Sequence, residues 1–469
     1  MINPHIFRAY DIRGIAHLPK SEKSVDLTPE TMLLIGKGVG THLKRHSGPN
    51  LVLGYDCRVS ADDLTQAFIE GALSTGCSIT NIGMVPTPML YFASCYYGFD
   101  GGVAITASHN PKEYNGVKIV GKDAHSVCGA DLQDVLKLIQ AQDFETGKGE
   151  LKHMSVFEDY VSTLSNLVHL ERPLKVVVDA GNGAAGPYIR SFFETLGCEV
   201  IALYEEPDGN FPNHPANPEE IENMQDLIAA VQDHHADLGI GFDGDADRVG
   251  IVDEDGHHYS ADLLLLLLSR ELLSRKPGSK IVFDVKVSQI LIRDIEANGG
   301  IPVMTKTGHS FIEKQMREVG APLAGEISGH MFFAENYYGF DDAFLAAAKI
   351  LEILSRTEKP FSSLLNNLPV SVCTPELKSS CPDDKKFAIV DQITKNLASQ
   401  FECITIDGVR VVFDENSWGA VRCSNTSPNL TIRFEAPDAK RLKEIMALML
   451  LELKKYPEVD LWWENETFS

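Results

Sequence analysis

The stretch KVVVDA (residues 175–180) is a short apolar run that reaches an aspartate near its end, and most of the chain follows its pattern. Two further runs have the same form, LVLGYD at 51–56 and KIVFDV at 280–285. After each run come a helical stretch and a second strand led by glycine, at 74–80, 196–203 and 298–305. Continuous Val, Ile and Leu runs separated by helical segments are typical of strands buried on both faces, as in parallel α/β sheets. The repeats therefore predict three related α/β units.

Each unit contains a further apolar strand that runs directly into a polar loop. These segments are GGVAITASHNP at 101–111, ADLGIGFDGDADR at 236–248 and APLAGEISGH at 321–330. In open α/β sheets, ligands bind beyond the carboxyl ends of the strands, so we expect the three loops to converge on one cleft. Ordinary connections on three separate domains are the alternative, and the repeats alone do not distinguish the two arrangements.

The amino-acid composition of the chain changes after Pro369. Segment 371–386 is rich in Ser, Pro and charge, which is typical of a domain boundary, and we expect a hinge there. Beyond it, DGVRVVFDENSWGAVRCS and NLTIRFEA predict short strands, and Asp438 to Lys455 predicts a helix. These elements predict an α+β fourth domain. The expected domains are residues 1–150, 151–257, 258–368 and 369–469.

Composition limits the classes of partner and compartment. The 469 residues carry a formal charge of −24, which argues against nucleic acid or an anionic membrane as a partner. Nine cysteines without a C-x-x-C pair predict reduced thiols. Arg8, Asp11 and Arg13 stand where a signal peptide needs an apolar core, so we expect a cytoplasmic protein. The apolar run Leu263 to Leu268 is too short to span a bilayer and predicts a buried helix.

Three carboxylates lie at alternate positions in DGDADR (243–248), directly after the predicted strand LGIGF. Asp243, Asp245 and Asp247 can offer oxygen ligands to one hard cation, and Mg²⁺ commonly keeps open positions for water or phosphate. The spacing also fits an EF-hand, but Arg248 stands where that loop needs glycine, and a strand precedes the loop where a helix is required. A solvated acidic turn is the plain alternative. The pattern favours a metal site.

Ser108 lies in TASHNP (106–111), at the end of the corresponding strand of the first unit. A serine at a strand terminus beside His109 is a candidate nucleophile or phosphate carrier. Taken alone, the motif fits an ordinary loop better, and the absence of a G-x-S-x-G pattern argues against an esterase-like triad. A phosphate on Ser108 would complete the shell of a Mg²⁺ ion held by the three aspartates.

Two further loops carry polar side chains suited to a sugar phosphate. In GEISGH (325–330), Glu326 and Ser328 suit contacts with vicinal hydroxyls, although a turn that stabilises itself explains them equally well. In RCSNTSP (422–428), together with Arg433 on the next strand, the planar guanidinium and the small polar groups indicate an anion cradle in preference to a plain turn.

Isolated cations lie near the same loops. They are Arg13, Lys118, Lys286 and His309, and each can act in proton transfer or phosphate binding. Each is also compatible, by itself, with a surface charge or a capping group.

Together, FRAYDIRG (7–14), TASHNP, DGDADR, GEISGH and RCSNTSP resemble the α-D-phosphohexomutase family, over essentially the whole chain. The chain is most similar to the bacterial phosphomannomutase/phosphoglucomutase branch. That resemblance implies an α/β fold of three related domains with mixed sheets, and a smaller α+β C-terminal domain, around a central cleft. It also implies a monomer that binds small sugar phosphates.

The resemblance further implies a mutase reaction. Phosphorylated Ser108 donates its phosphoryl group to a hexose 1- or 6-phosphate, and the resulting hexose 1,6-bisphosphate turns over in the cleft and returns its other phosphate to Ser108. Mg²⁺ is held by Asp243, Asp245, Asp247 and the phosphoserine.

The other site residues have the following implied roles. Arg248 neutralises charge on the transferring group. Glu326 and Ser328 bind the 3- and 4-hydroxyls of the sugar. The phosphate that does not react is bound by Arg422, Ser424, Asn425 and Thr426. The substrate-binding set also includes Tyr10, Arg13, His330 and Arg433. The candidates for proton transfer are His109, Lys118, Lys286 and His309, and the sequence does not rank them.

Two other enzymes and a binding protein are the alternatives. The phosphoglucosamine mutase branch typically has Gln in the sugar loop and an S-G-T-E-P phosphate loop, whereas this chain has Ile327 and SNTSP (424–428), which favours glucose and mannose phosphates. A metal-dependent sugar-phosphate phosphatase would use Asp243 as its nucleophile. A sugar-phosphate binding protein would have no turnover.

Overall fold

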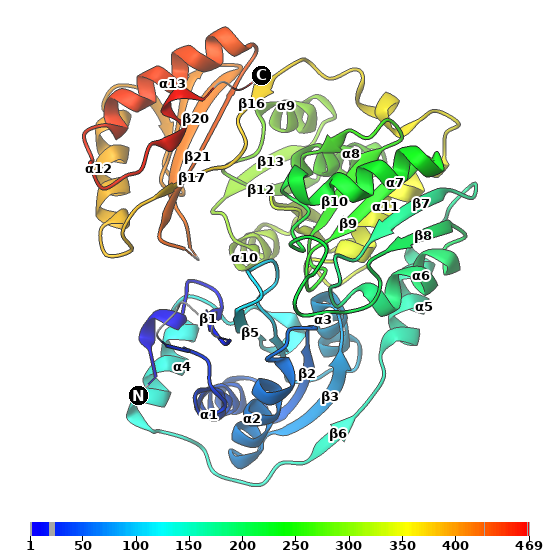
Figure 1. Cartoon of the computed structure of the whole chain (residues 1–469), viewed down its shortest axis with the longest axis vertical. Coiled ribbons are helices and arrows are strands. Elements are labelled where there is room, and N and C mark those ends of the chain that lie inside the picture. Colours follow the sequence, from blue (N-terminus) through cyan, green and yellow to red (C-terminus); the bar gives the residue numbers. More distant parts are fainter. Residues whose placement is uncertain (1, 18–23, 426, 467, 469) are drawn as a thin grey trace.

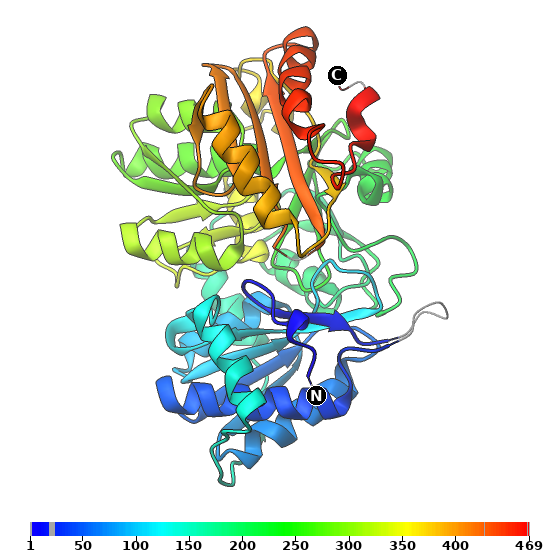
Figure 2. The same ribbon diagram turned by 90° about the vertical axis from the view of Figure 1, so that its left-hand side faces the viewer.

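The computed structural model describes residues 2–17, 24–425, 427–466 and 468 of the chain. Three α/β units follow one another along the chain, and a smaller fourth unit packs beside the third (Figure 1). The view turned by 90° shows the fourth unit standing over the amino-terminal part of the first (Figure 2). The architecture predicted from the repeats is thereby confirmed.

The first three sheets share one strand order. In each, the repeated apolar strand lies between two parallel neighbours, and a fourth strand returns antiparallel beside the strand that enters the polar loop. The sheets are therefore mixed. Their common strands are β2 (Asn50–Tyr55), β3 (Ser78–Met84), β4 (Gly101–Ile105) and β5 (Tyr114–Val120); β7 (Lys175–Asp179), β8 (Glu199–Leu203), β9 (Leu238–Phe242) and β10 (Val249–Asp253); and β12 (Lys280–Asp284), β13 (Ile301–Thr305), β14 (Leu323–Gly325) and β15 (Met331–Phe333).

Short edge strands extend two of these sheets. β1 (Ile12–Ile15) pairs with β5, and β6 (Leu151–His153) pairs with β3. β11 (His258–Tyr259) pairs with β10. The first and second sheets thus continue past the domain boundaries expected at residues 150 and 257. Strands of two or three mostly polar residues carry no alternating apolar signal, so the sequence gives no warning of them.

Helices cover the sheets, and one apolar core runs through all three α/β units. It includes Val52 of the first sheet, Val178 of the second and Phe283 of the third. The predicted buried helix over Leu263 to Leu268 is confirmed as part of α8. The helices of these units are α1 (Pro29–His46), α2 (Ala61–Ser74), α3 (Thr87–Tyr96), α4 (Ala130–Ala141), α5 (Phe157–Leu167), α6 (Gly186–Thr195), α7 (Gln225–His234), α8 (Ala261–Arg275), α9 (Gln289–Ala297), α10 (His309–Val319) and α11 (Ala343–Ser355).

The fourth unit is an antiparallel sheet with two helices on one face. Its strands are β16 (Val372–Cys373), β17 (Leu377–Ser380), β18 (Glu402–Ile404), β19 (Val409–Asp414), β20 (Ser417–Cys423) and β21 (Asn429–Ala436), and its helices are α12 (Lys386–Ala398) and α13 (Ala439–Leu453). Apolar residues at alternate positions, such as Val409 and Val411, join the helix-side core. Because successive side chains alternate between the faces of a sheet, residues such as Arg410 and Arg422 lie on the other face. Segment 371–386 contains β16 and β17.

Within the described residues, no helix is long and apolar enough to cross a membrane.

A buried carboxylate joins the first and third units and gives a stability prediction. Glu313 of α10 is 4% exposed, accepts a hydrogen bond from Ser126 and pairs with Arg317 at 2.5 Å. Burial, opposed by Arg317, raises the pKa of Glu313 from 4.5 to about 7. Because its pKa is raised, the protonated Glu313 carboxyl contributes to the stability of the fold below pH 4.5, and this contribution is lost as the pH rises through about 7.

Replacing Glu313 by Gln removes this dependence. Between pH 4.5 and 7.5, we expect the free energy of unfolding of the wild type to fall relative to that of Glu313→Gln by on the order of 2 kcal/mol. Urea unfolding of both proteins over a pH series measures the difference. Parallel profiles would contradict the assignment.

Candidate active site

All four units line one cleft of about 710 Å³. Its lining comes from the loops at the carboxyl ends of β4, β9 and β14 and from the loop between β20 and β21. The ribbon views show how the four units that carry these loops are arranged (Figures 1 and 2). The sequence-predicted residues that line it are Tyr10, Arg13, Ser108, His109, Lys118, Arg248, Lys286, His309, Glu326, Ser328, His330, Arg422, Ser424 and Asn425. The structure therefore brings most of the predicted set together.

Ser108 follows β4 and faces the metal loop of the second unit. Its Oγ donates to Asp243 Oδ2 at 2.6 Å and lies 3.2 Å from His109 Nδ1. The serine is 1% exposed and has a backbone φ of +52°. A non-glycine residue in this left-handed region is strained, and such strain is common where a loop presents a reactive side chain.

Three aspartates lie beneath Ser108, in the loop after β9. Asp243, Asp245 and Asp247 are fully buried, and each offers a carboxylate oxygen within 4.8 Å of the other two. Asp245 Oδ1 has no hydrogen-bond partner among the described residues, whereas Asp247 Oδ1 lies 3.3 Å from His330 Nε2. Buried carboxylate oxygens without donors are unfavourable unless a cation neutralises them. The donor set consists only of carboxylate oxygens, which is the chemistry that Mg²⁺ prefers, so these residues fit that ion.

Lys118 of β5 supplies a positive charge beside two of these aspartates. Its Nζ donates to Asp245 Oδ2 at 2.7 Å and also to Asp247 Oδ2. Burial alone would lower the pKa of Lys118, but the two carboxylates outweigh it and hold the pKa well above its usual value. Burial and its two acidic neighbours raise the pKa of Asp243 well above normal, whereas Lys118 and His330 overcome burial and hold that of Asp247 well below normal.

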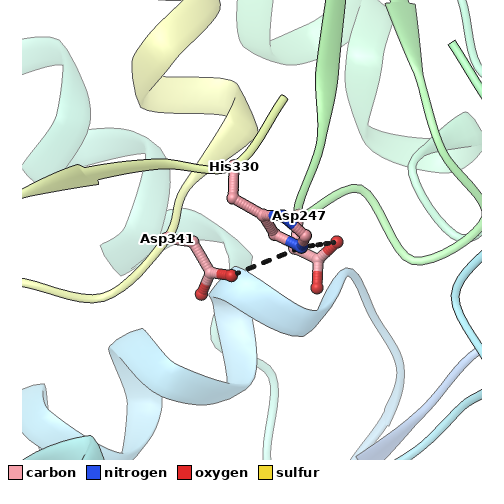
Figure 3. A group of neighbouring side chains, drawn as sticks. All are labelled: Asp247, His330 and Asp341. Atoms are coloured by element: carbon pink, nitrogen blue, oxygen red, sulfur yellow. Dashed lines mark ion pairs between the residues drawn. The ribbon is translucent and has the colours of Figure 1, made fainter. Parts of the chain in front are cut away.

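His330 lies between carboxylates of the second and third units. Figure 3 shows its imidazole beside Asp247 and Asp341. Its Nε2 lies 3.3 Å from Asp247 Oδ1 and 3.8 Å from Asp341 Oδ2. Its Nδ1 lies 3.1 Å from Glu326 Oε2 and 2.8 Å from Ser328 Oγ. These acidic neighbours, Asp247 first, overcome burial and raise the pKa of His330 to about 10. His330 is therefore a cation at neutral pH.

Two other histidines of the cleft are neutral. Burial, with Arg248 and Arg13 adding to it, lowers the pKa of His109 well below its usual value. Burial and Lys118 do the same for His309, whose ring packs edge-on against Tyr10 at 4.9 Å between centroids. Neutral imidazoles can accept protons, which charged lysines cannot.

The fourth unit contributes cations and small polar groups at the far side of the cleft. Arg422 Nε donates to Asp407 Oδ2 at 2.7 Å, while its Nη2 is buried without a hydrogen-bond partner in the described chain. Asn425 Nδ2 donates to Thr307 O of the third unit at 3.0 Å. Thr426, also predicted here, lies outside the described residues. An unpaired guanidinium nitrogen beside a polar loop is suited to an anionic ligand.

Arg433 does not line the cleft. Its Nη1 donates to Lys286 O at 2.7 Å, and the guanidinium lies 3.8 Å from Asp262. Arg433 lies two residues beyond the level of Arg422 in the sheet, which is a distance of about 6.6 Å along a strand. It therefore lies under the third unit and away from the loop that holds Arg422. We therefore remove Arg433 from the phosphate-binding set. It supports the backbone of Lys286, whose side chain pairs with Glu376 and does line the cleft.

Other lining residues were missed by the sequence analysis. Glu219 and Glu220 come from the second unit, and Glu376 and Lys378 come from the fourth. Lys378 pairs with Glu220 at 3.2 Å across the cleft. No sequence motif identifies them, because they come close to the site only when the units pack together. Arg58 does not line the cleft but donates to the backbone of the serine loop, and it was also missed, although it lies two residues after the repeated strand at 51–56, in DCRVS.

Comparison with known proteins agrees with this geometry. The chain matches the models of phosphoglucomutase/phosphomannomutase α/β/α domain I over residues 4–146, domain II over 158–256, domain III over 260–371, and the C-terminal domain over 376–451. The chain belongs to the phosphoglucomutase/phosphomannomutase family. The motifs in which the resemblance was found lie within these matched segments.

Relatives of this family match nearly the full chain. A phosphomannomutase/phosphoglucomutase of Pseudomonas syringae pv. tomato is 43% identical over 97% of both chains. A phosphoglucomutase of Neisseria gonorrhoeae is 39% identical over 98% of this chain and 99% of its own. The crystal structure of a phosphoglucomutase/phosphomannomutase family protein from Burkholderia thailandensis has a TM-score of 0.89 and 40% identity, covering 97% of this chain and 98% of that one.

Proposed function

We propose that this family member interconverts hexose 1-phosphates and hexose 6-phosphates, with glucose and mannose as the sugars and Ser108 as the carrier of the phosphoryl group. The observation that carries the proposal is the position of Ser108: its Oγ lies 2.6 Å from Asp243, in a cleft lined by all four units. A hexose 1,6-bisphosphate is the intermediate, and it primes the enzyme by phosphorylating Ser108.

Asp243, Asp245 and Asp247, with oxygens of the phosphoserine, would hold Mg²⁺. When bound, the ion supplies positive charge that neutralises the transferring phosphoryl group. Arg248 lies 4.0 Å from Asp243 Oδ2 and lines the cleft, so its guanidinium stabilises the same negative charge from the protein side.

The phosphoryl transfer balances as follows. The bond between phosphorus and Ser108 Oγ breaks while a bond to the free hydroxyl oxygen of the sugar forms. The proton of that hydroxyl passes to a neutral imidazole, for which His109 and His309 are the candidates because burial keeps both rings unprotonated, and Ser108 Oγ, which keeps the electron pair of the broken bond, takes up a proton to become the serine hydroxyl. Lys118 and Lys286 remain charged and act on phosphate and carboxylate oxygens. The reverse transfer from the other end of the sugar restores the phosphoserine.

The fixed partners of the substrate lie on the third and fourth units. Glu326 and Ser328 bind the 3- and 4-hydroxyls, which occupy equivalent places in both orientations of the sugar. Arg422, Ser424, Asn425 and Thr426 bind the phosphate that is not reacting, and Tyr10, Arg13 and His330 complete the lining. A constant anchor at one end lets one serine serve both ends of the sugar.

³¹P NMR tests the proposal directly. The enzyme is incubated with Mg²⁺, a trace of glucose 1,6-bisphosphate and either glucose 1-phosphate or mannose 1-phosphate. Conversion of both to 6-phosphates is expected. Release of inorganic phosphate would instead indicate a phosphatase with Asp243 as nucleophile.

We expect dual specificity from the same contacts. Glucose and mannose differ only at C2, and binding through the 3- and 4-hydroxyls does not sense that difference. The kcat/KM values for the two 1-phosphates should differ by less than ~10³-fold, which corresponds to about 4 kcal/mol of discrimination. Steady-state kinetics with each sugar phosphate measure this ratio, and a larger one would mean that another group reads C2.

A further inference from the structure

The guanidinium of Arg58 lies under the serine loop and binds its backbone. Nη2 donates to Ser108 O at 2.8 Å and to Asn110 O at 2.6 Å. Nη1 donates to Pro111 O at 2.7 Å and to Tyr114 O at 2.9 Å. One side chain thus binds four carbonyl oxygens over residues 108–114. We propose that Arg58 is a positioning residue for phosphoryl transfer, which sets the place of Ser108 through the backbone of this loop.

Every donor of Arg58 is used. The fifth N–H, on Nε, donates to Asp56 Oδ2 at 3.1 Å, and the Arg58 backbone N–H donates to Asp56 Oδ1 at 3.0 Å. The side chain is 0% exposed. A buried guanidinium is tolerated only when its charge and its N–H groups are satisfied, and here five donors meet five acceptors. A lysine has three donors on one atom and cannot reproduce this arrangement.

The serine loop needs such a support because its conformation is strained. Ser108 keeps a φ of +52°, and strain of this kind persists only where the surroundings fix it from several sides. Arg13 Nη1 binds Ala107 O at 2.8 Å, and Thr106 Oγ1 accepts from the Ser108 N–H at 2.8 Å. These contacts fix the residue before Ser108 and its own N–H. Arg58 fixes the Ser108 carbonyl and the turn that follows.

The second unit packs over the same arginine. The ring of Phe211 lies 5.4 Å from the guanidinium carbon, a cation–π contact, and Phe211 also lines the cleft. Gly209 approaches Arg58 so closely that an added Cβ would lie 2.7 Å from its Cα. Gly244 of the metal loop approaches Ser108 O, where a Cβ would come within 2.5 Å. Arg58 therefore lies where the serine loop and two loops of the second unit meet, and it sets the distance between Ser108 and Asp243.

This inference rests on the proposed role of Ser108. If Arg58 only stabilised the fold, its replacement would change the melting temperature and leave the turnover of the folded enzyme unchanged. If it positions Ser108, turnover falls in the folded enzyme while substrate affinity, which depends on the third and fourth units, is retained.

The test uses the full-length enzyme with Arg58→Ala, Arg58→Lys and Phe211→Leu. Arg172→Ala is the matched control, because Arg172 also donates to a backbone carbonyl, Thr357 O at 3.0 Å, but away from the cleft. We expect kcat of Arg58→Ala to fall about 10²-fold with KM within about threefold, as a small misplacement of a reacting group produces. Millimolar methylguanidinium should restore part of kcat to Arg58→Ala, whereas Arg58→Lys should stay impaired. Arg172→Ala should retain wild-type kcat.

³¹P NMR of enzyme phosphorylated by glucose 1,6-bisphosphate gives a second readout. The phosphoserine resonance of Arg58→Ala should be shifted from that of the wild type and move back with methylguanidinium. A folded Arg58→Ala with kcat within threefold of wild type and an unchanged resonance would overturn the inference. If Arg58→Ala does not fold, Phe211→Leu decides: about a tenfold lower kcat supports the inference, and wild-type kcat overturns it.

Failure of the proposed function looks different. A wild-type enzyme that turns over without any phosphoserine resonance, or a Ser108→Ala variant with wild-type activity, removes the role of Ser108 itself. An Arg58 variant that behaves as wild type while Ser108 carries phosphate removes only the inference.

Discussion

Replacement of Ser108 by alanine is expected to lower mutase kcat by at least ~10⁴-fold, because loss of the nucleophile from a covalent mechanism removes the reaction path and leaves only binding. Substrate affinity should change little, since we propose that Glu326, Ser328 and Arg422 bind the sugar and the distal phosphate. Coupled kinetics with glucose 1-phosphate measure kcat. Isothermal titration with the same sugar phosphate measures affinity.

The control separates loss of the nucleophile from loss of a buried hydroxyl. Ser355 is 3% exposed and lies in α11, outside the residues that line the cleft. Ser355→Ala should keep kcat within a few-fold of wild type. If Ser108→Ala retained more than a tenth of wild-type turnover, Asp243 would become the candidate nucleophile, and a covalent intermediate sensitive to hydroxylamine would then be expected.

The sequence predicted best those features that follow from the order of strands and loops along the chain. A strand that ends in a polar loop places that loop at the carboxyl edge of its sheet, so three repeats predicted one cleft before any side chain was placed. The loops that carry Ser108, Asp243 and Glu326 were predicted to meet in this way. Family resemblance then added the order of the four loops, including the one that begins at Arg422.

What the sequence missed depends on contacts between distant segments. Asp341 lies 3.8 Å from His330 only because the turn before α11 passes beside the sugar loop. Glu376 approaches Lys286 only when the fourth unit is packed. Arg433 is the converse case: it lies near the phosphate loop in sequence but turns under the third unit, because strand geometry carries it away from the cleft. Neither periodicity nor motif spacing contains this information.

Loss of one metal-loop carboxylate should be nearly as severe as loss of Ser108. Asp245 is the most informative position, because Oδ2 accepts from Thr87 Oγ1 at 2.7 Å, from Thr106 Oγ1 at 3.1 Å and from Lys118 at 2.7 Å, while Oδ1 has no partner in the described chain. The amide oxygen of an asparagine can keep all three donors. Its NH₂ group then faces the position where a cation needs an oxygen.

Asp245→Asn should therefore fold normally and fail to bind Mg²⁺. We expect kcat/KM to fall at least ~10³-fold, since a metal contributes several kcal/mol to stabilising a transferring phosphoryl group. Wild-type enzyme stripped with EDTA should lose activity to a similar extent and regain it with Mg²⁺. Calorimetric unfolding gives an independent readout: Mg²⁺ at 100 times its Kd stabilises the wild type by about 2.7 kcal/mol, and this gain should vanish in Asp245→Asn.

Asp341→Asn is the matched control, and it decides which of two neighbouring clusters holds the ion. Asp247 belongs to both: with Asp243 and Asp245 it forms one candidate set, and with His330 and Asp341 it forms the other. The acidic neighbours of His330 favour its protonated ring, so a metal at the second set would have to displace a proton, and we expect the first set to hold the ion. Asp341→Asn should accordingly keep the Mg²⁺-dependent gain in stability. If Asp341→Asn lost that gain and Asp245→Asn kept it, the metal would belong beside His330, and the transfer from Ser108 would lack the charge that neutralises it.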